Sequence, residues 1–427
     1  MKKILVIFLI QGYLMAATLF KVNVDGVEVP VIFEKDNRLP LTSVRFIFKD
    51  SGYLASNKAG LVSMSASLLN EGSKKEGAIN FAKELENRAI SLSVNSGKET
   101  FVFSIESLKE QFNFAVEKLI ELINDPNYSK DTFKKIVKKR VAVLKKKEDN
   151  YDYIASNGLK SILFESTPLA LPYLGTKESI ESLKLLDLKD YINTHLHLDN
   201  LIVVVGGDFN KREVEDFVTK VAKNLKRGKV EPLKKISASS KMSTKEIQKP
   251  TKQAYIYFGA PYNMDISDKK RVIGKVASFI LGSSGFGSRL MEEIRVKRGL
   301  AYSVYSRFNV NKTNSYFSGY LQTKLKSQQE AIKVVKEIID NFVKNGVTKD
   351  ELESAKKFFL GSEPLRVETL SQRVYRAFNE YYSGAGLGFR KEELKIIENL
   401  TLEELNSFIK EHNEITKLSF YIVTNKK

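Results

Sequence analysis

Cysteine is absent from this chain of 427 residues, and histidine occurs only three times, as His195, His197 and His412. Without a thiol the chain cannot form a disulfide, a thiolate metal site or a lipid-anchored amino terminus. His195 and His197 stand two positions apart and would face the same way on a strand, but no third ligand accompanies them. We therefore expect structural or surface roles for these histidines, and a metal site built elsewhere would lack ligands.

Long apolar runs and acidic residues are also scarce. No run approaches the roughly 18 apolar residues of a membrane-spanning helix. The chain has 51 Asp and Glu and 69 Lys and Arg, which gives a net charge of +18. The lysines are spread along the chain and no ribonucleoprotein sequence or zinc finger is present, so nucleic acid is not the expected partner. The charge is interpreted mainly as a source of solubility, with acidic peptides as a secondary prediction.

The amino terminus has the three parts of a secretory signal peptide. Lys2 and Lys3 precede a short apolar run, and Ala16 and Ala17 provide small residues for cleavage. This order predicts a signal peptide over residues 1–17. The mature protein is expected to be soluble and exported, and periplasmic if the host is a double-membrane bacterium.

The remaining chain repeats one order of elements: a strand, a helix, a hairpin and two long helices. The first copy places them at 44–48, 60–69, 90–105, 110–124 and 129–147, and the second at 255–257, 268–281, 302–321, 328–345 and from 348 onward. Ser129 and Thr348 cap corresponding helices. The pattern predicts an α+β fold made by tandem duplication of a unit of roughly 200 residues, each with an antiparallel or mixed sheet covered by helices.

Composition sets the expected boundaries of the two copies. Residues 226–253 are rich in Lys and Ser, contain Pro232 and Pro250 and show no sustained periodicity, so they are expected to form a linker. The N-terminal half is then residues 18–225, and the C-terminal half is residues 254–427.

Residues 281–306 combine a glycine-serine loop, a short charged helix and a strand. The helix carries its acids first and its bases last, the order that a helix dipole favours, and Gly299 provides its end. From Leu300 the alternation places Leu300, Tyr302 and Val304 on one side of a strand. Arg295 and Tyr302 are therefore able to converge on a bound chain. The alternative is an amphipathic helix whose charges are merely solvated.

Three segments, together with the duplication, carry a resemblance to a known family. They are residues 167–180 (TPLALPYLGTKESI), 199–209 (DNLIVVVGGDF) and 288–306 (SRLMEEIRVKRGLAYSVYS). With them, nearly all of the mature chain resembles the insulinase/pitrilysin-type zinc peptidases, which include the mitochondrial processing peptidase and paired bacterial proteases. The resemblance implies two halves that form a clam-shell chamber.

The zinc motif of that family is degenerate in this chain. Active members carry H-x-x-E-H on a helix of the first half, and the matching residues 60–73 read GLVSMSASLLNEGS. The motif positions fall on Ser63, Ala66 and Ser67, which provide neither zinc ligands nor a general base. The family's later glutamate ligand falls near Leu144 or Lys145. The resemblance thus implies that this chain binds no metal.

A second feature of the family is retained. Active members place an arginine and a tyrosine, seven positions apart, across the chamber from the zinc, and Arg295 and Tyr302 match them. By this resemblance the pair would bind a substrate carbonyl and stabilise its oxyanion. Arg298 is an alternative arginine. The loop residues expected to bind substrate are Gly282, Ser283, Ser284 and Gly285.

In the paired bacterial members one chain carries the zinc motif and the other carries the arginine and tyrosine. The resemblance therefore implies a non-zinc, substrate-binding subunit of a heterodimeric exported zinc metallopeptidase that hydrolyses short or unfolded peptides. Zinc would come from a homologous partner, and this chain would be inactive alone. The alternative is a catalytically silent homodimeric peptide-binding or scaffold protein, in which Arg295 and Tyr302 serve only packing.

Overall fold

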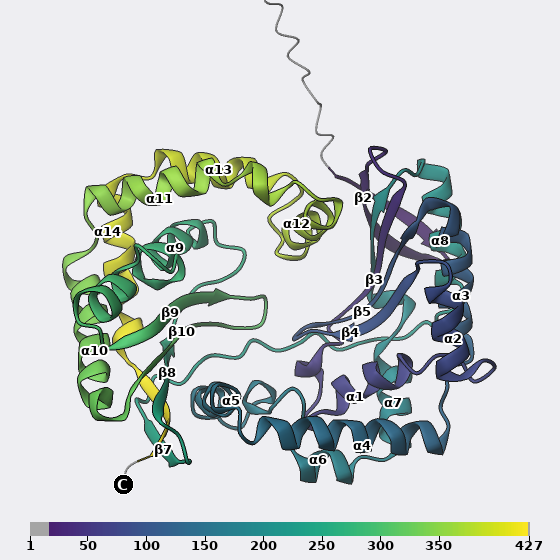
Figure 1. The fold of residues 1–427 in the computed structure, drawn as a ribbon. Helices are drawn as coiled ribbons and strands as arrows, with labels where there is room; N and C mark the ends of the chain where they lie inside the picture. The colour runs from purple at the N-terminus through teal and green to yellow at the C-terminus, as the bar shows by residue number, and fades with distance from the viewer. Residues whose placement is uncertain (1–16, 426–427) are drawn as a thin grey trace, which may run out of the picture.

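The computed structural model describes residues 17–425, so the predicted signal peptide lies outside the described residues except for Ala17. Figure 1 shows two halves that face each other, each with one sheet and a set of helices on its outer side. Each sheet contains strands from one copy of the repeat. The predicted α+β duplication is confirmed.

The N-terminal sheet has six strands in the order β1-β2-β6-β3-β5-β4. Its pairs are antiparallel except that β2 runs parallel to β6. The alternating apolar residues of β3 and β5 face the core, as their period of two requires. The strands are β1 (Thr18–Val24), β2 (Val27–Lys35), β3 (Leu41–Lys49), β4 (Ser91–Ser96), β5 (Thr100–Leu108) and β6 (Leu201–Gly207).

The C-terminal sheet has five strands in the order β7-β11-β8-β10-β9, and β7 runs parallel to β11. This order repeats the first sheet from β2 onward, so β7 is the counterpart of β2. The expected linker at 226–253 therefore includes a strand of the second copy, which begins at Thr244 rather than at residue 254. The strands are β7 (Thr244–Gln248), β8 (Gln253–Pro261), β9 (Ala301–Val310), β10 (Ser315–Lys324) and β11 (Ser419–Thr424).

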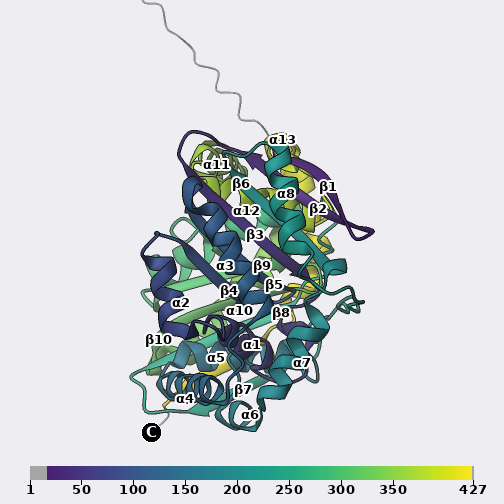
Figure 2. The same ribbon diagram turned by 90° about the vertical axis from the view of Figure 1, so that its right-hand side faces the viewer.

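The helices of the described part of the first copy, apart from α5, surround the N-terminal sheet and the base of that half. In Figure 2, α2, α3 and α8 lie in front of the strands and cover their outer face. Ser129 caps α4 as predicted, since its hydroxyl accepts a hydrogen bond from the Thr132 amide at 3.1 Å. The helices are α1 (Leu61–Leu69), α2 (Gly77–Glu86), α3 (Phe112–Asn124), α4 (Lys130–Lys147), α5 (Tyr151–Leu163), α6 (Lys177–Ser182), α7 (Leu185–His195) and α8 (Lys211–Ala222).

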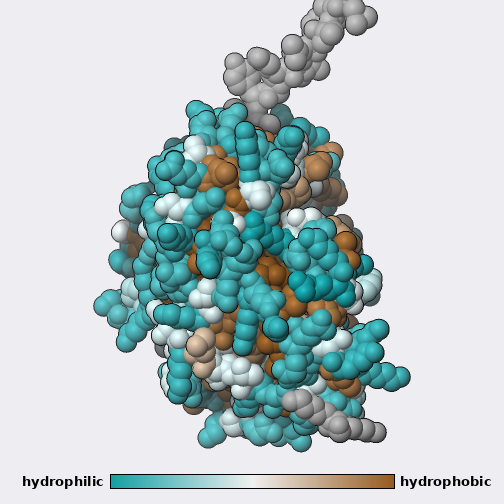
Figure 3. Space-filling view, turned by 90° about the vertical axis from the view of Figure 1, so that its left-hand side faces the viewer, coloured by the Kyte–Doolittle hydropathy of each residue, from teal (hydrophilic) through white to brown (hydrophobic). Residues whose placement is uncertain are grey.

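The helices of the second copy follow the same plan. Thr348 caps α11 in a capping box with Glu351, as its sequence predicts. Hydrophilic side chains predominate on the side of the molecule where α10, α11 and α14 lie (Figure 3). None of the helices in the described part of the chain has the length and apolar character needed to cross a bilayer. The helices are α9 (Arg271–Ser278), α10 (Gln328–Asn345), α11 (Lys349–Gly361), α12 (Leu370–Tyr382), α13 (Phe389–Asn399) and α14 (Leu402–Glu411).

The two halves exchange one helix each. Helix α5 follows α4 in the first copy and packs on β8 and β11 of the C-terminal sheet, while α12 follows α11 in the second copy and packs on β2 and β6 of the N-terminal sheet (Figure 1). Ala155 and Leu159 of α5, and Val374 of α12, are buried in these contacts. Burial of apolar surface by both helices holds the halves in one arrangement.

Polar contacts between the two halves are buried as well. The Arg373 guanidinium of α12 donates to the Glu34 carboxylate of β2 at 3.1 Å, and it also pairs with Asp36. Glu99, in the β4–β5 hairpin, accepts a hydrogen bond from the Thr313 amide in the β9–β10 hairpin at 2.7 Å. Each half thus provides charged groups whose partners lie in the other half.

Candidate functional site

The expected zinc motif lies on α1, with its side chains turned inward. Ser63 is 3% exposed and Ala66 is 4% exposed. The two serine hydroxyls donate to backbone carbonyls of their own helix, Ser63 to Gly60 at 3.0 Å and Ser67 to Ser63 at 2.9 Å. These are ordinary helix contacts of serine, and they leave the hydroxyl oxygens free to accept.

A guanidinium lies over the motif positions. Arg140 of α4 donates to the Ser63 hydroxyl at 2.7 Å, to the Ser67 hydroxyl at 3.1 Å and to the Leu174 carbonyl at 3.2 Å. The pKa of Arg140 is lowered by burial, and the nearby Tyr173 and Tyr153 oppose that shift. A fixed organic cation therefore contacts the same two positions that carry histidines in active members of the resembled family.

The sequence alone did not identify Arg140. The family's glutamate ligand was expected to fall near Leu144 or Lys145, but Leu144 is buried in the core and Lys145 is exposed. The position of α4 that reaches α1 is one turn earlier, because residues four apart share a helix face. One signal was available: Arg140 is the only arginine in a helix otherwise rich in lysine.

The residues around Arg140 do not fit zinc. Ser63, Ala66 and Ser67 provide no imidazole or carboxylate, and a guanidinium repels a divalent cation. Within residues 17–425, no group of three or more His, Asp or Glu is arranged to hold a metal ion. His195 stacks on Tyr191 with ring centroids 4.1 Å apart, and His412 pairs with Glu414.

Restoring the motif is expected to restore zinc binding only if Arg140 is also removed. In the triple variant Ser63→His, Ala66→Glu, Ser67→His, the guanidinium still occupies the metal position, so no stoichiometric zinc should remain after dialysis. Adding Arg140→Glu replaces the cation by a shorter carboxylate that can meet the longer imidazoles, and zinc should then be retained. Metal analysis of both variants tests this, and stoichiometric zinc in the triple variant would contradict it.

The retained pair lies on the second copy, at the junction of a π-helical turn (Met291–Lys297) and β9. The helix ends where the sequence predicts: Gly299 has φ +60°, and the Leu300 amide donates to the Ile294 carbonyl at 2.9 Å. This bond spans one residue more than that of a Schellman motif, as the wider π-helical turn before it requires, and Gly299 in the left-handed region turns the chain directly from helix into strand. Arg295 and Tyr302 therefore lie on either side of one tight turn.

The structure corrects the expected alternation of the strand. Leu300 and Val304 are buried, but Tyr302 is 78% exposed instead of sharing their face. The β9–β10 pairing shifts at this point, with Ser303 opposite Gln322 and Ala301 opposite Thr323, so Tyr302 has no partner in the ladder. An extra residue of this kind is a β-bulge, and it redirects the tyrosine out of the sheet.

Arg295, and not Arg298, is the arginine that meets the tyrosine. The Arg295 guanidinium carbon lies 4.8 Å from the ring centre of Tyr302 and 4.8 Å from that of Phe286. No carboxylate of residues 17–425 is within ion-pair distance of it, whereas Arg298 is 3.8 Å from Glu293. Arg295 is thus held between two exposed aromatic rings with its donor groups unclaimed by an acid.

The glycine-serine loop divides into a buried part and an accessible part. Gly282 is buried, and a Cβ built on it would lie 2.8 Å from the Ser306 amide and 2.2 Å from the Ser306 hydroxyl. Its role in this structure is close packing against β9, so the expected substrate contact at Gly282 is not supported. Ser283 and Ser284 line a pocket, and Gly285 has φ +73° with open space around it.

Comparison with known families agrees with this architecture. The family description "Insulinase (Peptidase family M16)" matches residues 50–177, and "Peptidase M16 inactive domain" matches residues 182–359. A Helicobacter pylori protein named "Non-peptidase homolog YmxG" is 42% identical over 430 residues, which cover 100% of this chain and 99% of that protein. A Bacillus subtilis protein called "Uncharacterized zinc protease YmxG" is 26% identical over 233 residues, covering 55% of this chain and 56% of that protein.

Solved structures share the fold. A peptidase M16 inactive domain from Pseudomonas fluorescens superposes with a TM-score of 0.87 at 24% identity, covering 96% of this chain and 98% of that one. A protease from Helicobacter pylori superposes with a TM-score of 0.81 at 17% identity, covering 96% of this chain and 100% of that one. At these identities the likeness concerns the fold alone.

Proposed function

We propose a function from one premise, that this chain belongs to the insulinase (M16) family of peptidases and is a catalytically inactive, non-zinc member of it. It is the substrate-binding subunit of a heterodimeric metallopeptidase, and a homologous partner holds the zinc. The observation that carries the proposal is the contrast between two places in one chain. Arg140 fills the degenerate motif, while Arg295 is half-buried and Tyr302 exposed, and neither pairs with an acid of residues 17–425.

The chemistry of the retained pair suits a peptide carbonyl. A guanidinium and a phenol both donate hydrogen bonds, and both bind an oxygen more strongly as negative charge develops on it. The Phe286 and Tyr302 rings limit the positions that the Arg295 side chain can take, which lowers the entropy lost when it binds. Ser283 and Ser284 belong to the same loop as Phe286, which contacts Arg295, and they line a pocket where they offer further polar contacts.

The proposed complex works outside the cytoplasm. Residues 1–17 have the pattern of a signal peptide, and a partner in the same compartment would carry one too. The name of the 42% identical relative, "Non-peptidase homolog YmxG", agrees with a chain that does not cleave peptides alone. A chamber between two chains would admit short or unfolded peptides and exclude folded proteins.

Purification from the native host tests the partnership. The mature chain carrying an affinity tag should recover, in equal amounts, a second M16 protein that retains H-x-x-E-H. Recovery of a homodimer that binds peptide and recruits no such relative would contradict the proposal and favour the silent peptide-binding or scaffold protein.

A further inference from the structure

We propose that a basic pocket in the second copy binds the carboxylate side chains of an acidic stretch in the peptide. This assignment deepens the proposed function by naming a substrate class. The pocket lies between α9, α12 and α13 and has a volume of about 580 Å³, which is the size of an ordinary ligand pocket. Five cationic side chains line it, against two carboxylates: Arg271, Lys275, Arg366, Arg376 and Arg390 against Glu380 and Glu393.

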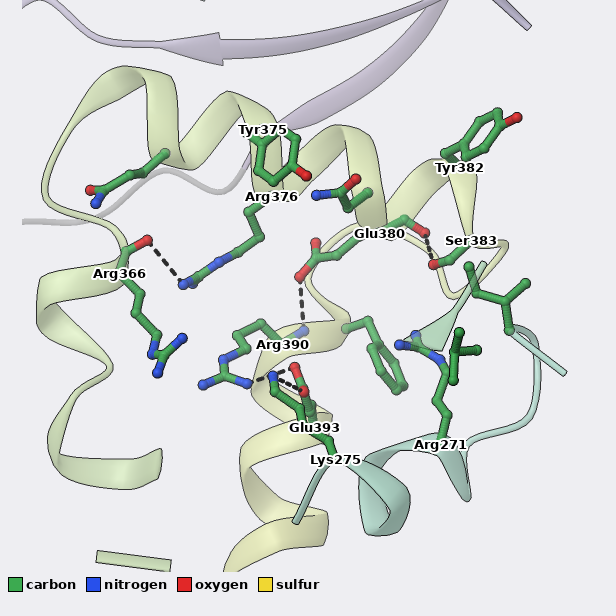
Figure 4. A pocket seen from close by; sticks show the side chains of 15 residues that line it. Arg271, Lys275, Arg366, Tyr375, Arg376, Glu380, Tyr382, Ser383, Arg390 and Glu393 are labelled. Atoms are coloured by element: carbon green, nitrogen blue, oxygen red, sulfur yellow. Dashed lines mark hydrogen bonds and ion pairs between the residues drawn. The ribbon is translucent and has the colours of Figure 1, made fainter. Parts of the chain in front are cut away.

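Three guanidinium groups converge there from three different elements. Figure 4 shows Arg366, Arg376 and Arg390 extending toward the same opening. Arg376 and Arg390 both pair with Glu363, at 2.6 and 2.7 Å, so this carboxylate is shared by two guanidinium groups, and Arg390 also pairs with Glu393 at 2.7 Å. Shared in this way, the acids position the arginines without satisfying all of their donors, since a guanidinium has five.

Two cations of the pocket have no acid of their own. Arg366 donates to the Ser362 hydroxyl at 3.2 Å, and the Arg271 guanidinium lies 4.9 Å from the centre of the Phe389 ring. Neither forms an ion pair with any residue from 17 to 425. Burial lowers the pKa of Arg271, and the Glu393 and Glu380 carboxylates of the pocket oppose that shift without forming an ion pair with it.

The basic surface continues to the proposed substrate site. A second pocket, of about 480 Å³, shares Arg271, Lys275 and Arg366 with the first and extends along β9 to Ser283 and Ser284. Arg307 of β9 also lines it. The two pockets therefore connect the glycine-serine loop, next to Arg295 and Tyr302, with the convergent arginines.

A buried polar group in the second pocket also lacks a partner. Tyr262 is 1% exposed, and its hydroxyl has no hydrogen-bond partner among the described residues. Burial raises the pKa of Tyr262, so this phenol is a neutral donor. A buried donor without an acceptor is costly, and a ligand oxygen in this pocket would satisfy it.

The shape of the surface favours a peptide over a small anion. Cationic groups line both pockets, with Arg376 and Arg390 in the first and Arg307 in the second, and Phe308, Phe358 and Phe359 provide apolar contacts in the second. Tyr302 lies near the start of β9 and lines neither pocket, whereas Val310, at the end of β9, lines both. Since an extended chain rises about 3.3 Å per residue, the bound acids would lie roughly eight residues from the peptide bond at Tyr302.

Fluorescence polarisation with the wild-type chain alone tests the assignment. The probes are labelled extended peptides of about 12 residues with a run of glutamates at either end, and matched peptides with glutamine instead. The glutamate peptide of one polarity should bind about tenfold more tightly than its glutamine match, and salt should weaken its binding. Arg366→Gln or Arg271→Gln should remove most of that difference, while Arg212→Gln, an exposed arginine on α8, should not.

Three results would overturn the assignment. They are equal affinity for the glutamate and glutamine peptides, an unchanged preference in both pocket variants, and displacement of the peptide by an equal concentration of inorganic phosphate. The assay needs no partner and no hydrolysis. Its failure would therefore leave the zinc-bearing partner untouched, and failure to find a partner would leave this result standing.

Discussion

Complexes that contain the Arg295→Ala variant are expected to hydrolyse peptides about 10²- to 10³-fold more slowly than wild-type complexes, which is the usual cost of removing one donor to an oxyanion. The loss should appear mainly in kcat, because the charge on the carbonyl oxygen develops only in the transition state. Binding of the partner should be unchanged, since Arg295 contacts Phe286 and Tyr302 of its own chain. Steady-state kinetics on the reconstituted complex measure both quantities.

Two further variants separate hydrogen bonding from packing. Tyr302→Phe keeps the ring that stacks on Arg295 and removes only the hydroxyl, so kcat should fall while thermal stability stays constant. Arg298→Ala removes an equal charge three residues away, at a side chain directed to Glu293, and should leave kcat almost unchanged. Equal losses of kcat for Arg295→Ala and Arg298→Ala would show that the rate depends on positive charge in this region and not on the pair Arg295 and Tyr302.

The variant Arg373→Met is expected to lower the free energy of unfolding by about 3–5 kcal/mol, as breaking a buried ion pair does. Arg373, Glu34 and Asp36 are 6%, 7% and 10% exposed at their side chains. The guanidinium also donates to the Val367 and Glu368 carbonyls, each at 3.0 Å. Removing it leaves a buried carboxylate on β2 without its cation, and α12 then remains on the other half's sheet through its apolar contacts alone.

The deficit should depend on pH in a defined direction. Burial already raises the pKa of Glu34 above its ordinary value of 4.5, and Arg373 opposes that rise. The pKa of Glu34 in the Arg373→Met variant should therefore be higher still. A carboxyl whose pKa is raised in the folded state destabilises that state when ionised, and protonation removes the penalty. The loss in the free energy of unfolding should therefore shrink as pH falls from about 8 to about 5. Asp36 stays ionised in that range because its pKa is lowered to about 2, chiefly by its hydrogen bond to Arg38.

The control for this prediction is Arg38→Met. Arg38 pairs with the same Asp36 from the solvent side, with its own side chain 61% exposed, and surface pairs contribute only about 0–1 kcal/mol. Urea unfolding of the two variants at both pH values provides the comparison. Similar deficits for Arg38→Met and Arg373→Met, or a deficit independent of pH, would contradict the role given to the buried cluster.

The features that the sequence predicted correctly are those that depend on local pattern and spacing. The duplication, the helix caps at Ser129 and Thr348 and the helix end at Gly299 depend on residues close together in the chain, and the structure has all of them. The pairing of Arg295 with Tyr302 followed from a family spacing of seven. The residues that predict each of these features lie close together in the sequence.

Features that depend on distant partners were missed. Strand β7 has only five residues and no buried one, and it is defined by parallel pairing with β11 at the other end of the chain. The bulge at Tyr302 depends on the register of β10. Arg140 reaches Ser63 from 77 residues away, and its being the only arginine of α4 marks the residue without indicating its partner. The exchange of α5 and α12 is likewise a matter of tertiary packing.

The most direct test of the account measures bound zinc and peptide hydrolysis in three samples: this chain alone, the zinc-motif partner alone, and an equimolar mixture. We expect no stoichiometric zinc and no hydrolysis for this chain alone, zinc in the partner, and full hydrolysis only in the mixture. Zinc-dependent hydrolysis by this chain alone, or a mixture no more active than the partner by itself, would contradict it.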